Sequence, residues 1–158
     1  MAELPPYRAT IDPGWIDFNG HVRDAFYVLM ASLAVDDVMD RIGLDAEYRA
    51  RAHGTLYTVE LHIHYLREIK LSDDVTVRST ILDFDRKRIH LGCRFHCARL
   101  SEPAAVCDMM LLHVVQGATP ASAPFPQTTT AKLESYRPAA ADIDAFGPLS
   151  RRIELKRR

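Results

Sequence analysis

The stretch WIDFNGHVRDAFY, residues 15–27, changes character halfway along its length. Its first half contains Asp17, Asn19 and Gly20, residue types that form tight turns. Its second half begins a long apolar segment with helical spacing, and Asp24 is a suitable N-cap for a helix there. The sequence therefore predicts a structured turn that leads directly into a helix, and the fold depends on what packs against that helix.

The helix is predicted to run from Asp24 to about Ile42, with Gly43 as its stop. Carboxylates gather on one side of it, between residues 36 and 40. The apolar residues mostly keep helical spacing: Phe26, Leu29, Met30, Leu33, Val38 and Ile42. Because most of its surface is apolar, we expect the helix to be largely enclosed.

Four segments of alternating pattern follow the helix, at residues 55–66, 75–84, 89–100 and 104–116. In the first of them one face is predicted to consist of Tyr57, Val59, Leu61, Ile63 and Tyr65. In the third, one face is predicted to consist of Ile89, Leu91, Cys93, Phe95 and Cys97. A long helix followed by an antiparallel meander predicts an α+β fold in which the sheet wraps the helix. We assign this domain to residues 1–116 and a Pro/Ala/Thr-rich C-terminal arm, ending in a basic segment, to residues 117–158. Within the arm, residues 138–146 are predicted to form a short helical piece.

The length, charge and cysteine content of the chain limit the classes of function that it can have. A chain of 158 residues suits one domain, and 20 basic against 21 acidic residues provide no field that would recruit nucleic acid or an anionic membrane. The three cysteines show no disulfide spacing, and the first residues do not resemble a signal peptide. Apolar runs are too short to span a bilayer, so we expect a cytoplasmic protein with no membrane or nucleic-acid partner.

Local chemistry leaves two interpretations of residues 15–27. One is a purely structural loop, in which the turn and the helix cap explain most of the residues. The other notes that Asp17 is a second carboxylate just before a helix N-terminus, where free N–H groups can hold a developing oxyanion. A carboxylate beside such donors can activate water or attack a carbonyl carbon itself.

The segment from Asp17 to Tyr27 resembles the signature of hotdog-fold acyl-CoA thioesterases of the 4-hydroxybenzoyl-CoA thioesterase type. That signature is an acid, two variable residues, Gly-His-Val, two asparagines, a small residue and an aromatic residue. With the order of elements, the resemblance covers residues 7–116. It implies a hotdog fold, hydrolysis of an acyl-CoA with no separate cofactor or metal, and a homodimer or dimer of dimers.

Carried over by position, the resemblance makes Asp17 the catalytic acid and the backbone N–H of Asp24 the group that polarises the thioester carbonyl. The expected substrate-binding residues are Trp15, Phe18, Asn19, Gly20, His21 and Tyr27. Arg23 and Asp24 replace the usual asparagines, which puts the hydrogen bonds of that pair in doubt. A related subgroup uses a glutamate inside the helix, but Ser32 and Leu33 occupy the matching positions, so its mechanism is excluded.

A closer likeness is to betainyl-CoA thioesterases of carnitine breakdown, carried by residues 21–49, 58–70 and the final SRRIELKRR. It implies a quaternary ammonium on the acyl group, which ring faces and carboxylates can hold. Trp15 is the preferred wall of such a pocket. A thioesterase for another small acyl-CoA, a hotdog hydratase and a non-catalytic acyl-CoA-binding module remain as alternatives.

Two further groups have weaker functional interpretations. Histidines on neighbouring strands could bind a metal, although two ligands on one strand seldom suffice, and we expect no metal. The basic tip at residues 86–88 and the basic C-terminus could contact the phosphates of coenzyme A or simply stay in solvent.

Overall fold

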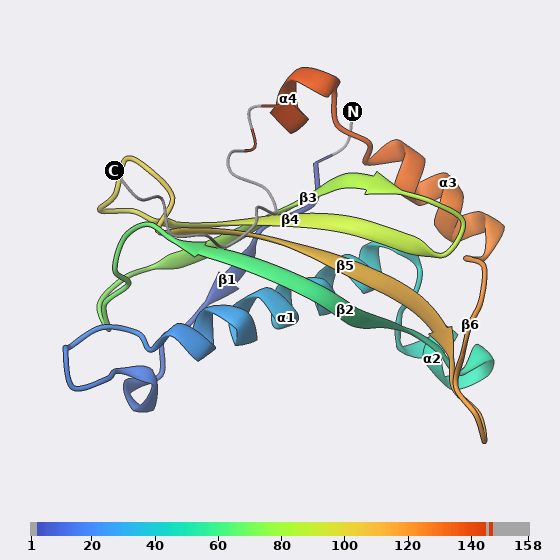
Figure 1. The fold of residues 1–158 in the computed structure, drawn as a ribbon, viewed down its shortest axis with the longest axis horizontal. Coiled ribbons are helices and arrows are strands. Elements are labelled where there is room, and N and C mark those ends of the chain that lie inside the picture. Colours follow the sequence, from blue (N-terminus) through green and yellow to red (C-terminus); the bar gives the residue numbers. More distant parts are fainter. Residues whose placement is uncertain (1–2, 145, 147–158) are drawn as a thin grey trace, which may run out of the picture.

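The computed structural model describes residues 3–144 and 146, apart from the side chain of Asp144. A curved antiparallel sheet wraps one face around a long helix (Figure 1). The elements are β1 (Tyr7–Ala9), a 3-10 turn (Pro13–Trp15), α1 (Asp24–Ile42), α2 (Ala46–Ala52), β2 (Gly54–Tyr65), β3 (Val75–Phe84), β4 (Arg88–Cys97), β5 (Ala105–Val115), β6 (Ala121–Ser122), α3 (Gln127–Ser135) and α4 (Ala140–Asp144). This arrangement confirms the predicted α+β class.

The helix α1 begins and ends where the sequence predicts, with Gly43 in the left-handed conformation as its C-cap. The N-cap prediction is wrong: Arg23 is the N-cap, and Asp24 is the first helical residue. The buried stripe follows i, i+3, i+4 spacing through Tyr27, Met30, Ala31, Ala34, Val35, Val38, Met39 and Ile42. Leu29, predicted for the apolar face, lies beside this stripe and is 39% exposed. In the single chain α1 is therefore covered on one side only.

The strand order in the sheet is β1-β3-β4-β5-β2, so the sequentially adjacent strands β3, β4 and β5 also pair in space. The inner face of β4 is the predicted one, and its residues Ile89, Leu91, Cys93, Phe95 and Cys97 are buried in the core against α1. The strand β2 lies at one end of the order and pairs only with β5 among the described residues. Its other edge is open in the single chain.

The alternation predicted for β2 is wrong in its first half. A bulge between Thr58 and Glu60 inserts one extra residue relative to β5. Because side chains alternate with period two, this insertion reverses the facing of everything before it. Leu61 packs against the core, whereas Tyr57 and Val59 are exposed at 39% and 56%.

Part of the C-terminal segment packs on the body of the protein. The strand β6 pairs with the end of β5, and α3 contacts α1 through the fully buried Leu133. The sequence missed α2 and α3, while α4 lies inside the helical piece predicted for residues 138–146. The proposed boundary at residue 116 stays a prediction, and the basic residues 151–158 lie outside the described part of the chain.

The three cysteines are buried and free, as their spacing predicts. Among the described residues, no helix is long and apolar enough to span a membrane. The cytoplasmic location stays a prediction.

Candidate active site

The residues before α1 form a tight loop that is closed by its own backbone. Ile16 and Val22 pair as an isolated bridge, and the Asp17 N–H donates to the carbonyl oxygen of His21 at 2.9 Å. The turn needs a left-handed residue, and Gly20 supplies it with φ = 80°. The predicted tight turn is therefore present, and it holds Asp17 at its base.

The turn also fixes the carboxylate of Asp17. Its Oδ1 accepts hydrogen bonds from the backbone N–H of Asn19 at 2.8 Å and of His21 at 3.4 Å. Partial desolvation raises the pKa of Asp17, but these hydrogen bonds, that of the Asn19 amide and the charge of Arg23 outweigh it and leave the pKa below its ordinary value. Asp17 is thus ionised at neutral pH, as a nucleophile or a general base must be.

The first turn of α1 lies beside this loop. The N–H of Arg23 donates to the carbonyl oxygen of Trp15, and the N–H of Ala25 donates to the side chain of Asp24. The N–H of Asp24 has no hydrogen-bond partner among residues 3–144 and 146. This free donor sits at the positive end of the helix dipole, which is suited to stabilising an oxyanion.

A cavity of about 340 Å³ brings these groups together. Of the predicted site residues, Asp17, His21, Asp24 and Tyr27 line it. Its other lining residues are Val22, Tyr65, Leu66, Arg67 and Glu68. The loop before α1 and the end of β2 thus meet at one site, although about 40 residues separate them.

The other predicted binding residues do not line this cavity. Asn19 and Gly20 form the turn that holds the carboxylate of Asp17. Trp15 is stacked on Phe26, with ring centroids 5.1 Å apart. Phe18 is 93% exposed and extends into solvent. For these four residues, direct contact with substrate stays a prediction.

The sequence missed Arg67 and Glu68. Glu68 lies 2.8 Å from His21, measured from Oε2 to Nε2. The loop that carries both residues is tied down by the buried carboxylate of Asp73, which accepts from the Arg99 guanidinium at 2.7 and 2.9 Å. The adjacent charged residues Arg67 and Glu68, directly after a predicted strand, could have indicated a functional loop. Nothing in the sequence places this loop beside Asp17.

The weaker hypotheses find little support in this single chain. Among the described residues, no cluster of three or more His, Cys, Asp or Glu side chains could hold a metal ion. The β3–β4 tip lies at the α3 end of the sheet, whereas α1 begins at the opposite end (Figure 1). At the tip, Arg88 pairs with Asp85 at 2.6 Å and Lys87 contacts Ser122. The tip is therefore far from Asp17 within one chain.

Comparison with known proteins agrees with this geometry. The model of the thioesterase-like superfamily matches residues 11–133. A betainyl-CoA thioesterase from Pseudomonas aeruginosa is 39% identical over 136 residues, which are 86% of this chain and 85% of that protein. These matches confirm the expected thioesterase family.

Two solved structures are also similar. A candidate thioesterase from Pseudomonas putida KT2440 superposes with a TM-score of 0.81 at 42% identity and covers 99% of both chains. A hypothetical protein from Staphylococcus aureus, solved in complex with CoA, has a TM-score of 0.78 at 30% identity over 85% of both chains. They confirm the hotdog architecture. The chain therefore belongs to the thioesterase-like superfamily.

Proposed function

We propose that the protein hydrolyses betainyl-CoA to betaine and free coenzyme A, without a metal or a separate cofactor. The observation that carries the proposal is the single cavity that contains both the ionised Asp17 carboxylate and the first residue of α1. The similarity to the betainyl-CoA thioesterase of Pseudomonas aeruginosa supports the choice of substrate.

Asp17 would act on the carbonyl carbon of the thioester in one of two ways. As a general base, it takes a proton from water while the water oxygen attacks; as a nucleophile, its own oxygen attacks and water later cleaves the anhydride. In both cases the C–S bond breaks, and coenzyme A leaves as a thiolate that then takes up a proton. The free N–H of Asp24 would stabilise the negative charge that develops on the carbonyl oxygen.

The charges at the cavity support a cationic acyl group. The carboxylates of Asp17, Asp24 and Glu68 line it, against one guanidinium, that of Arg67. A quaternary ammonium donates no hydrogen bond, so it is held by carboxylate fields and by ring faces. Tyr65 supplies a ring that is 48% exposed at this cavity. We therefore propose Tyr65 as the wall for the trimethylammonium group, in place of the sequence-based choice Trp15, whose ring is stacked on Phe26.

We further propose a homodimer formed along the open edge of β2, with a dimer of dimers as an extension. The large exposed apolar side chains of the described chain include Phe18, Val28, Leu29, Tyr57, Val59, Tyr65 and Leu66. All of them belong to β2, the start of α1 or the adjoining loops. A long edge strand with apolar side chains invites pairing with a second sheet, and a twofold axis would pair β2 with itself.

The decisive experiment measures free thiol release from a panel of acyl-CoAs that includes betainyl-CoA, acetyl-CoA and butyryl-CoA. We expect the highest kcat/KM with betainyl-CoA. A hydratase would leave the thioester intact, and a binding module would saturate without releasing thiol. Preferred release from a neutral acyl-CoA would keep the thioesterase but reject the betainyl substrate.

A further inference from the structure

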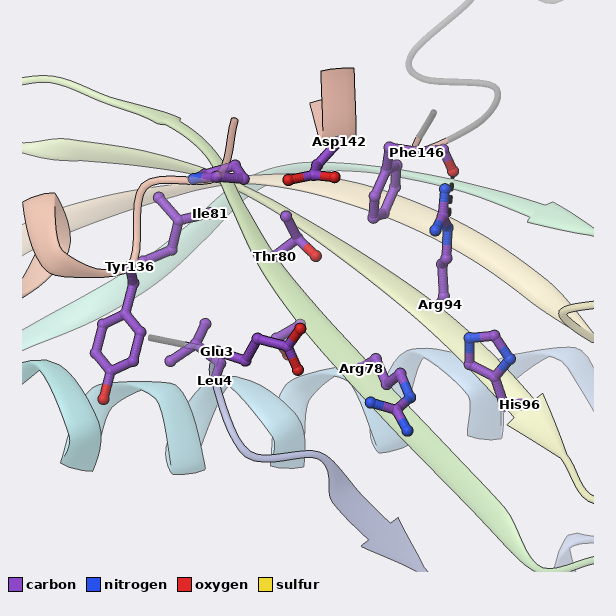
Figure 2. Close-up of a pocket in the computed structure, with 12 residues that line it drawn as sticks. Glu3, Leu4, Arg78, Thr80, Ile81, Arg94, His96, Tyr136, Asp142 and Phe146 are labelled. Atoms are coloured by element: carbon purple, nitrogen blue, oxygen red, sulfur yellow. Dashed lines mark hydrogen bonds between the residues drawn. The ribbon is translucent and has the colours of Figure 1, made fainter. Parts of the chain in front are cut away.

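A second cavity of about 440 Å³ lies over β3 and β4, on the side of the sheet that carries α4 (Figures 1 and 2). The two strands contribute Arg78, Thr80, Arg94 and His96 to its lining. The segment after α3 contributes Tyr136, Asp142 and Phe146, and the N-terminal segment contributes Glu3 and Leu4. None of these residues lines the cavity at Asp17, so this is a separate site.

The floor of this cavity carries an unfavourable pair of like charges. Arg78 and Arg94 stand directly opposite each other in the β3–β4 register. Like charges at such positions destabilise a sheet. Arg94 is held in place, since its Nε donates to the Phe146 carbonyl oxygen at 2.8 Å and its guanidinium lies 4.6 Å from the centre of the Phe146 ring. Arg78 has neither a hydrogen bond nor an ion pair with any residue in the described part of the chain.

The positive charges of Arg78 and Arg94 affect the imidazole of His96. Burial lowers the pKa of His96, and the charges of Arg78 and Arg94 lower it further. At neutral pH the ring is therefore mainly uncharged, with one N–H available to donate. Figure 2 shows His96 beside Arg94 on the same strand, with Arg78 on the neighbouring strand.

Apolar side chains also line this cavity. The ring of Phe146 is buried and lies directly over Gly92. A Cβ atom at residue 92 would collide with that ring, so only glycine fits beneath it. Leu4 and Ile81 are also buried at this cavity. The cavity thus combines guanidinium groups with apolar side chains in a space large enough for a small organic molecule.

We propose that this cavity binds a small organic monocarboxylate, with its carboxylate held by Arg78 and the N–H of His96 and its apolar body against Phe146. The Arg78 guanidinium, which has no partner among residues 3–144 and 146, matches a carboxylate in geometry and charge. The carboxylates of Glu3 and Asp142 also line the cavity, which disfavours a doubly charged anion such as phosphate. The site does not depend on the reaction at Asp17.

The experiment follows His96 by NMR in the full chain, with its imidazole signals assigned through their loss in His96→Gln. Benzoate is titrated as the carboxylate probe and inorganic phosphate as the competing anion. Because a bound anion stabilises the imidazolium, we expect saturating benzoate to raise the pKa of His96 by about one unit. Arg78→Gln should abolish this response while leaving thioester hydrolysis unchanged. The matched control, Arg41→Gln on α1, should keep the response.

Three outcomes would overturn the proposal. The first is a His96 pKa that does not move with benzoate in the wild-type protein. The second is an equal response in Arg78→Gln, since the anion would then sit elsewhere. The third is a larger and tighter response to phosphate than to benzoate, which would reject the carboxylate class. The pKa of His96 is measured without turnover, so its result is independent of the function proposed for Asp17.

Discussion

The hydroxyl of Tyr65 donates a hydrogen bond to the backbone carbonyl oxygen of Asp24 at 3.2 Å. This contact joins the end of β2 to the first residue of α1. The Tyr65 ring also meets the Tyr27 ring edge-on, with centroids 5.1 Å apart. Tyr27 in turn accepts from the N–H of Ile69 at 3.1 Å, and burial raises its pKa to about 12. The start of the helix and the loop after β2 are therefore held together by two tyrosines.

This connection leads to a prediction about substrate selectivity. We expect Tyr65→Leu to lower kcat/KM for betainyl-CoA about three- to thirtyfold more than for acetyl-CoA, since a ring face is worth roughly 0.5–2 kcal/mol to a cation. Tyr65→Phe keeps the ring and should preserve the preference. Trp15→Leu is the comparison: because Trp15 stacks on Phe26, we expect equal losses on both substrates. A selective loss in Trp15→Leu alone would assign the cation to Trp15.

Replacing the Asp17 carboxylate, the proposed catalytic group, tests the mechanism directly. We expect Asp17→Asn to fold normally and to lose turnover by about three powers of ten or more, because an amide is neither a base nor a nucleophile. Thiol release at saturating betainyl-CoA measures the loss, and circular dichroism checks the fold. Retention of more than about a tenth of wild-type turnover would remove Asp17 from the reaction.

The open edge strand β2 should be required for formation of the homodimer. We expect Val59→Arg to convert a dimer to a monomer at micromolar concentration, because Val59 is 56% exposed at the bulge of an open edge strand and a charge there opposes pairing. Ala131→Arg, on the exposed side of α3, is the matched control and should remain dimeric. Light scattering after size exclusion gives the masses. A wild-type monomer would contradict the dimer at once.

Because of the Asp73–Arg99 ion pair, we expect the free energy of unfolding to fall at acidic pH. Burial raises the pKa of Asp73, but its hydrogen bonds from Arg99 and from the N–H of Lys70 lower it below its ordinary value of 3.8. A depressed pKa stabilises the folded state above the unfolded pKa, and this contribution is lost as pH falls through the folded value. We expect Asp73→Asn to lower the free energy of unfolding by about 2 kcal/mol at pH 7, and by less below pH ~4.

Denaturant unfolding at a series of pH values measures this difference. The neighbouring Asp74→Asn is the control, since Asp74 is exposed and should change little. A difference between wild type and Asp73→Asn that stays constant down to pH ~2 would show that the carboxylate charge plays no part.

Removal of metal ions should leave the enzyme active. The proposed chemistry needs only Asp17, a backbone N–H and water, so dialysis against a chelator is expected to leave the rate of thiol release unchanged. Loss of activity that returns on addition of one divalent metal would show that a bound ion takes part in the reaction.

The elements whose signals are local could be predicted from the sequence. Turn residues followed by an apolar stretch of helical spacing place the loop and α1, and Gly43 ends the helix because it adopts the left-handed conformation without a steric cost. Strict alternation likewise predicts the buried face of β4. The Asp17 segment could be recognised as a candidate site because its whole signature lies within a dozen residues.

Which distant groups meet depends on tertiary packing and could not be predicted from the sequence. The bulge at Thr58 reverses the facing of β2 because one inserted residue shifts a period-two pattern, and the composition of the strand does not reveal it. Arg67 and Glu68 line the cavity at Asp17 because the buried Asp73–Arg99 pair holds their loop near the start of α1. Trp15 lies close to Asp17 in sequence yet stacks on Phe26, since burying two rings together outweighs exposing one. The signature within residues 15–27 predicts Asp17 as the acid, and packing across the sheet determines which residues surround it.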